Sequence, residues 1–118
     1  MFPIWELAIE RLNTIREPSR LVNVIAKRAI VEAQARYPEA AEALSAWYYD
    51  VKHAVWNNSA ELKDQYGTAS IVNSERVVFN ICGNKYRVVV RINYVSGTIF
   101  VRFIGTHAEY DLIDARTI

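Results

Sequence analysis

Residues 79–111 read FNICGNKYRVVVRINYVSGTIFVRFIGTHAEYD. Apolar residues alternate with other residues along 85–94 and 98–104, which is the period-two pattern of β-strands that bury one face. Gly-Asn at 83–84 and Ser-Gly at 96–97 supply the turn residues between consecutive strands. The stretch therefore predicts an antiparallel meander, followed directly by a short segment that contains a histidine, a tyrosine and an aspartate.

The spacing of apolar residues also predicts the elements of the rest of the chain, where segments with helical spacing occur beside further strands. Helices are predicted over residues 4–16, 27–36, 38–56 and 58–66, and strands over 21–25, 69–72, 76–81, 85–94 and 98–104. Pro18, Pro38 and Gly67 supply the breaks. Trp47, Tyr48 and Trp56 are expected in the core and His53 at the surface. The order predicts an α+β domain, with N-terminal helices packed on a mostly antiparallel sheet.

Length and composition limit the class of protein. A chain of 118 residues with 52% hydrophobic residues is expected to form one globular domain. Cys82 is the only cysteine, so no intramolecular disulfide is possible, which suits a reducing compartment. No apolar run approaches the roughly 18 residues of a membrane span, and the start lacks a basic signal region. We therefore expect a cytoplasmic protein with no membrane partner, and no metal or cofactor, since two distant histidines do not make a metal cage.

The charge is distributed unevenly along the chain. Residues 76–104 contain five Lys or Arg and no Asp or Glu, whereas residues 1–75 contain eight cations and ten acids. A block of cations on a sheet is typical of a surface that binds phosphates. The alternative is that these cations only protect an antiparallel strand against edge pairing.

Strand parity predicts where these cations point. Lys85, Arg87 and Arg91 share one face of the first strand, and Arg102 of the next strand stands on the same side beside Phe100. The side chains predicted to face the core are Tyr86, Val88, Val90, Ile92, Tyr94, Ile99, Val101 and Phe103. One face of the sheet is thus expected to cover the helices, and the other to be basic.

Residues 105–111 follow the last strand and place three polar side chains together. His107 and Tyr110 are three residues apart and His107 and Asp111 four apart, so they are neighbours on one side of a helical turn. Imidazole exchanges protons near neutral pH, and a carboxylate can orient it, so the group suits acid–base chemistry. The alternative is a capped C-terminal turn, with Thr106 as the cap and Glu109 favouring the helix start.

Two runs within residues 77–114, VFNICGNKYRVVVRINY and FVRFIGTHAEYDLID, resemble the HigB family of bacterial type II toxins, which are RelE-like mRNA interferases. VNVIAKRAI and ARYPEAAEALSAWYYDVKHAVW are similar to the opening strand and helices of that family. The resemblance implies a RelE/ParE-like fold in a toxin domain over residues 22–118, preceded by an N-terminal extension over 1–21. Cys82 and Leu112 stand where the family often has a basic residue.

The resemblance also implies a function. RelE-like toxins act on messenger RNA engaged by the ribosome, where the ribose 2′-hydroxyl attacks the adjacent phosphate and protein cations stabilise the developing charge. A helix-turn-helix antitoxin of the HigA type silences them in a toxin–antitoxin hetero-oligomer. The implied catalytic residues are Lys85, Arg87, His107, Tyr110 and Asp111. The predicted RNA-binding residues are Asn84 from the same motif, Arg91 and Arg102 from strand parity, and Arg76 from the block of cations in residues 76–104.

Two other functions are compatible with the same residues. One is a non-catalytic RelE/ParE-like binding module that poisons a protein target such as DNA gyrase. The other is an RNA-binding or antitoxin-sequestering remnant without activity. A gyrase poison has no need for His107 and Tyr110 beside the cations, whereas a ribonuclease has, so the sequence favours the enzyme.

Overall fold

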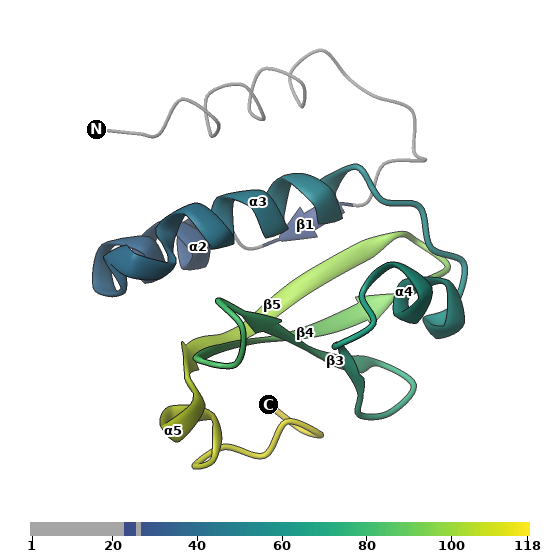
Figure 1. The fold of residues 1–118 in the computed structure, drawn as a ribbon. Helices are drawn as coiled ribbons and strands as arrows, with labels where there is room; N and C mark the ends of the chain where they lie inside the picture. Colours follow the sequence, from purple (N-terminus) through teal and green to yellow (C-terminus); the bar gives the residue numbers. More distant parts are fainter. Residues whose placement is uncertain (1–22, 26) are drawn as a thin grey trace.

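A five-stranded sheet carries the helices on one side and the C-terminal segment on the other (Figure 1). The computed structural model describes residues 23–25 and 27–118. The elements are β1 (Asn23–Ile25), α2 (Lys27–Arg36), the 3-10 turn η1 (Pro38–Ala40), α3 (Ala41–Lys52), α4 (Ser59–Gln65), β2 (Ser70–Ile71), β3 (Arg76–Ile81), β4 (Tyr86–Asn93), β5 (Thr98–Thr106) and α5 (His107–Tyr110). The predicted α+β class is confirmed.

The strand order is β1-β5-β4-β3-β2. β1 pairs in parallel with β5, and the other three pairings are antiparallel. The predicted bounds of α2 and β3 are confirmed, while the helix predicted over residues 4–16 lies outside the described residues. No helix in residues 27–118 has the length and apolar character needed to cross a membrane.

The helix predicted over residues 38–56 ends early, at Lys52. The His53 backbone N–H lies 3.3 Å from the carbonyl oxygens of both Tyr49 and Asp50, and the ring Nδ1 lies 2.8 Å from the Tyr49 oxygen. The next N–H, that of Ala54, donates to the Val51 oxygen at 3.1 Å, three residues back instead of four, so the α-helical pattern stops here. Ala54 and Trp56 are nevertheless buried, so the apolar period that suggested a longer helix reflects burial of a non-helical segment.

The main core lies between the helices and one face of the sheet. Trp47 of α3 packs edge-on against Phe79 of β3, with ring centroids 5.3 Å apart, and Tyr66 meets the same ring at 5.1 Å. The expected core positions of Trp47, Tyr48 and Trp56 are confirmed, since all three are buried. This face presents Val77, Phe79, Ile81, Tyr86, Val88, Val90, Ile92 and Ile99 to the helices.

A β-bulge at Arg102 changes the direction of the side chains in β5. Val90 is opposite Val101 while Val89 is opposite Phe103, so Arg102 has no partner on β4. The extra residue reverses the alternation, and Phe103 points away from the main core. The prediction that Phe103 shares the core face with Ile99 and Val101 is therefore wrong.

The second face of the sheet is not only basic. Val78, Val89 and Ala115 form a small buried cluster there, with Val72, Phe103, Tyr110, Ile113 and Ile118 partly buried around it. The C-terminal segment after α5 lies on this face, and its backbone accepts hydrogen bonds from the sheet. Arg76 Nε donates to the Ile118 oxygen at 3.1 Å and Arg102 Nε at 3.4 Å. The expected open basic face is thus corrected to a partly apolar face that the chain's own last residues cover.

Candidate active site at the end of the sheet

The candidate site lies where the β3–β4 turn meets the end of β5. Cys82 and Gly83 both have positive φ, 54° and 67°, and the turn that they form leaves Asn84 and Lys85 exposed. Positive φ is unusual for a residue other than glycine, so the turn at Cys82 has a constrained shape. The carbonyl oxygen of Lys85 accepts a hydrogen bond of 2.9 Å from the backbone N–H of His107. This bond ties the turn to the first residue of α5.

Helix α5 presents the predicted acid–base residues. His107 Nδ1 lies 3.3 Å from Asp111 Oδ2, and the two side chains are 49% and 59% exposed. At this distance the carboxylate can hold the imidazole ring in one orientation. Because both groups are open to solvent, a substrate has direct access to them.

Arg87 and Tyr110 contact each other in the same site. The guanidinium carbon of Arg87 lies 5.6 Å from the centre of the Tyr110 ring, a cation–π distance. Arg87 Nη1 also donates to the backbone oxygen of Asn84 at 2.9 Å. Lys85 is exposed, and no acceptor in the described part of the chain holds its ammonium group. The structure thus brings together Asn84, Lys85, Arg87, His107, Tyr110 and Asp111.

The other three predicted RNA-binding residues lie apart from this group and have internal partners. Arg91 Nε contacts Glu75 Oε1 at 2.7 Å, and this hydrogen bond lowers the pKa of the Glu75 carboxyl below its usual value. Arg76 Nη1 contacts the same oxygen at 3.4 Å. Arg91 is four residues along β4 from Arg87, or about 13 Å. Arg102 contacts the C-terminal backbone, as described above.

Glu75 is an acid that sequence reasoning missed, because it lies one residue before the cationic block. Arg76 and Arg91 are directly opposite each other on β3 and β4, and two like charges in that position destabilise a sheet. Asn73 Oδ1 accepts hydrogen bonds from the backbone N–H groups of both Glu75 and Arg76, which folds the turn so that the carboxylate reaches both arginines. Strand pairing is the signal that predicts the need for such an acid.

A contact between α5 and the end of α2 was also missed. The Tyr37 hydroxyl donates a hydrogen bond of 2.6 Å to Glu109 Oε1. The Tyr37 ring lies 5.1 Å from that of Tyr86, whose own hydroxyl hydrogen-bonds the Glu39 carboxylate. From the sequence, Glu109 was predicted only to favour the start of a helix, and no contact was predicted for Tyr37.

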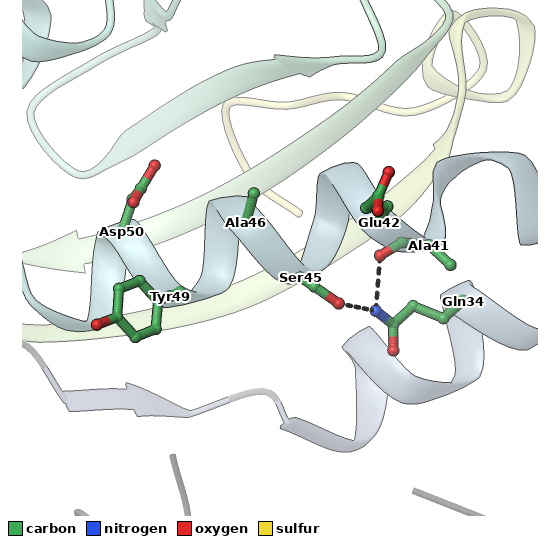
Figure 2. A pocket seen from close by; sticks show the side chains of 7 residues that line it. All are labelled: Gln34, Ala41, Glu42, Ser45, Ala46, Tyr49 and Asp50. Carbon is green, nitrogen blue, oxygen red and sulfur yellow. Dashed lines mark hydrogen bonds between the residues drawn. The ribbon is translucent and has the colours of Figure 1, made fainter. Parts of the chain in front are cut away.

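A groove of about 610 Å³ lies elsewhere, on the outer side of α3 (Figure 2). The Gln34 amide bridges the Ala41 carbonyl and the Ser45 hydroxyl at one end, both at 2.8 Å. Glu42 and Asp50 are among the lining residues, and no Lys or Arg of the described part of the chain lines the groove. The two carboxylates repel phosphate, so the described lining of this groove does not suit the chemistry of the site at the end of the sheet.

This chain is similar to a known protein family and to several characterised proteins. A family model described as HigB_toxin, RelE-like toxic component of a toxin-antitoxin system, matches residues 40–113, which include the β3–β4 turn and α5. The chain is 29% identical over 92 residues to "mRNA interferase HigB" of Escherichia coli O6:H1, covering 76% of this chain and 89% of the relative. It is 26% identical over 96 residues to "mRNA interferase toxin HigB" of Escherichia coli K12, covering 80% and 92%.

Proposed function

Because this chain belongs to the HigB family, the RelE-like toxic components of toxin–antitoxin systems, we propose that it is an endoribonuclease that cleaves messenger RNA during translation. The observation that carries the proposal is the cluster at the end of the sheet, where His107 and Asp111 stand 3.3 Å apart beside Lys85 and Arg87. The relatives named mRNA interferases support the substrate class.

In the proposed reaction the RNA supplies both the nucleophile and the leaving group. The ribose 2′-hydroxyl loses a proton and its oxygen bonds to the adjacent phosphorus, while the bond from phosphorus to the 5′-oxygen of the next nucleotide breaks and that oxygen gains a proton. His107 transfers a proton in this reaction and Asp111 orients its ring. Lys85 and Arg87 stabilise the charge that grows on the phosphate oxygens, and the Tyr110 ring supports Arg87.

The same proposal assigns the remaining predicted residues and partners. Asn84 contacts RNA beside the reacting phosphate. Arg76, Arg91 and Arg102 bind phosphates of the RNA backbone after they release their partners within the protein. The toxin domain covers residues 22–118, acts in the cytoplasm on ribosome-engaged messenger RNA, and is silenced by a helix-turn-helix antitoxin in a hetero-oligomer. Residues 1–21 are an extension that contributes no chemical group to the reaction.

Expression of the full chain alone is expected to arrest growth and translation, with transcripts cut within their coding regions. We would induce the chain in a bacterial host and follow protein synthesis, transcript ends and DNA integrity. Co-expression of a cognate antitoxin should restore growth. Arrest with intact transcripts and double-strand DNA breaks would instead support poisoning of gyrase, and no arrest at all would support an inactive remnant.

Replacing Lys85 by glutamine is expected to weaken RNA binding and to make it less dependent on salt. Each phosphate contact on single-stranded RNA contributes about 0.7 to the slope of log affinity against log salt concentration, so the slope should flatten by roughly that amount. Thermal stability should hardly change, because exposed charges contribute only about 0–1 kcal/mol to folding. Arg28→Gln, an exposed cation on α2, is the matched control. An unchanged slope for Lys85→Gln would remove Lys85 from the RNA path.

A further inference from the structure

We propose that Glu109 and Tyr37 form a positioning pair that fixes α5, and with it His107 and Tyr110, at the end of the sheet. The proposal rests on the nuclease function proposed above, and it adds two residues that do not touch the reacting phosphate. Both residues lie beside the cluster and contact each other directly.

A single carboxylate oxygen joins three parts of the chain. Glu109 Oε1 accepts the Tyr37 hydroxyl at 2.6 Å and the Thr106 backbone N–H at 2.8 Å. The Glu109 backbone N–H in turn donates to the Thr106 hydroxyl at 3.1 Å, which completes a capping box. A helix of four residues is not stable by itself, since nucleation costs more than one turn of hydrogen bonds returns. α5 therefore depends on contacts of this kind for its position.

Tyr37 is well held before it meets Glu109. Its backbone N–H donates to the Ala33 oxygen at 2.7 Å, which fixes it at the end of α2. Its ring packs at 5.1 Å against Tyr86, a buried residue of β4. Arg36 Nη1 donates to its hydroxyl oxygen at 3.3 Å, so the phenol accepts one hydrogen bond while it donates another. α5 is thus tied through Tyr37 to both the helical layer and the sheet.

The charge states of the pair match this geometry. The hydrogen bond from Tyr37, followed by that from the Thr106 backbone, lowers the pKa of the Glu109 carboxyl. Partial burial and the hydrogen bond to Glu109 raise the pKa of the Tyr37 phenol. At neutral pH the carboxyl is therefore ionised and the phenol protonated, so one group accepts and the other donates.

Gly105 leaves the space that the carboxylate occupies. A Cβ atom at this position would lie 2.6 Å from Glu109 Oε1 and 2.7 Å from Cζ of Phe103. Side-chain carbon atoms do not approach other groups this closely, so any larger residue at 105 would push Glu109 or the Phe103 ring away. The end of β5 is therefore shaped to receive the Glu109 side chain.

The test compares Tyr37→Phe, Glu109→Ala and Glu109→Gln in the full chain. The alanine variant is expected to lower the rate of cleavage at saturating RNA by about 10- to 100-fold, because a misplacement of about 1 Å can cost that much. Its half-saturating RNA concentration should change by less than about twofold, since the cations remain. Glutamine keeps an oxygen that accepts from Thr106 and Tyr37, so Glu109→Gln should stay within about threefold of wild type.

Two further results would identify the pair as one unit. Tyr37→Phe should lower the rate by about 5- to 10-fold, and adding it to Glu109→Ala should cause no additional loss, because the contact is already absent. The Asp111 N–H donates to the His107 oxygen, and its amide hydrogen should exchange faster in Tyr37→Phe and in Glu109→Ala than in wild type. Tyr49→Phe and Glu42→Ala, which line the groove on α3, are the matched controls and should change neither measurement (Figure 2).

The two measurements separate this proposal from the function on which it rests. Unchanged amide exchange in Glu109→Ala would overturn the positioning pair, whatever the chain cleaves. Faster exchange with a wild-type rate at saturating RNA would also overturn it, since the position of α5 would then not matter to the reaction. If the wild-type chain cleaves no RNA, the nuclease function fails, and a positioning role in catalysis fails with it.

Discussion

Replacing His107 by glutamine is expected to lower the rate of transcript cleavage by about 100- to 10,000-fold, the usual contribution of one positioned proton-transfer group. Glutamine keeps much of the volume and an amide donor, but it does not exchange a proton near neutral pH. The imidazole is exposed and 3.3 Å from the Asp111 carboxylate, so its loss should leave the fold intact. Single-turnover cleavage of ribosome-bound transcripts measures the effect.

Ribosome binding by His107→Gln should equal that of wild type, because the cations of the site are unchanged. His53→Gln is the matched control, since this second histidine lies at the end of α3, with its ring 4.4 Å from that of Tyr49. Cleavage by His107→Gln at a rate near wild type would show that the imidazole only begins α5. The catalytic role would then move to charge stabilisation by Lys85 and Arg87 alone.

Replacing Arg87 by glutamine is expected to reduce cleavage by about 100- to 1,000-fold, comparable to the loss of one preorganised donor to a transition-state oxygen. Arg87 stands on the Tyr110 ring and donates to the Asn84 backbone, so its charge is held in place before substrate arrives. The rate at saturating RNA, measured beside circular dichroism of the variant, separates chemistry from folding.

Arg91→Gln provides a graded comparison on the same strand and face. Arg91 is paired with Glu75 and stacks at 5.7 Å on Phe100, so its removal should lower the rate by less than about tenfold. Equal losses from the two substitutions would show that the whole face binds RNA with similar strength and that no special phosphate site exists at Arg87.

Local patterns predicted the elements well where each element depends on its own residues. Alternation and turn residues gave β3 at its observed bounds, and Asn58 caps α4 by accepting from the Glu61 N–H at 3.0 Å. The early end of α3 was not predictable from periodicity, because Ala54 and Trp56 are buried as helical residues would be. The bulge in β5 depends on its register with β4, which no single strand records.

In the candidate site, too, local features were predictable from the sequence, whereas contacts that depend on tertiary packing were not. Residues 84–87 and 107–111 come together because a hairpin turn and the end of the following strand are neighbours in any meander. The partners of the remaining arginines were not visible, because Glu75 and the C-terminal segment reach them only through tertiary packing. The contact between Tyr37 and Glu109 joins residues 72 positions apart, which no local pattern predicts.

The single extra residue in β5 determines which face of the sheet each later side chain of this strand occupies. Before Arg102 the core side of β5 is given by Ile99 and Val101, and after it by Ile104 and Thr106. If all residues of β5 paired regularly with β4, Arg102 would lie opposite Val89, and every position from Phe103 to Thr106 would turn over to the other face. α5 would then leave the strand toward the helical layer, with His107 on the side opposite Arg87. The bulged residue thus determines on which side of the sheet α5 and the candidate site lie.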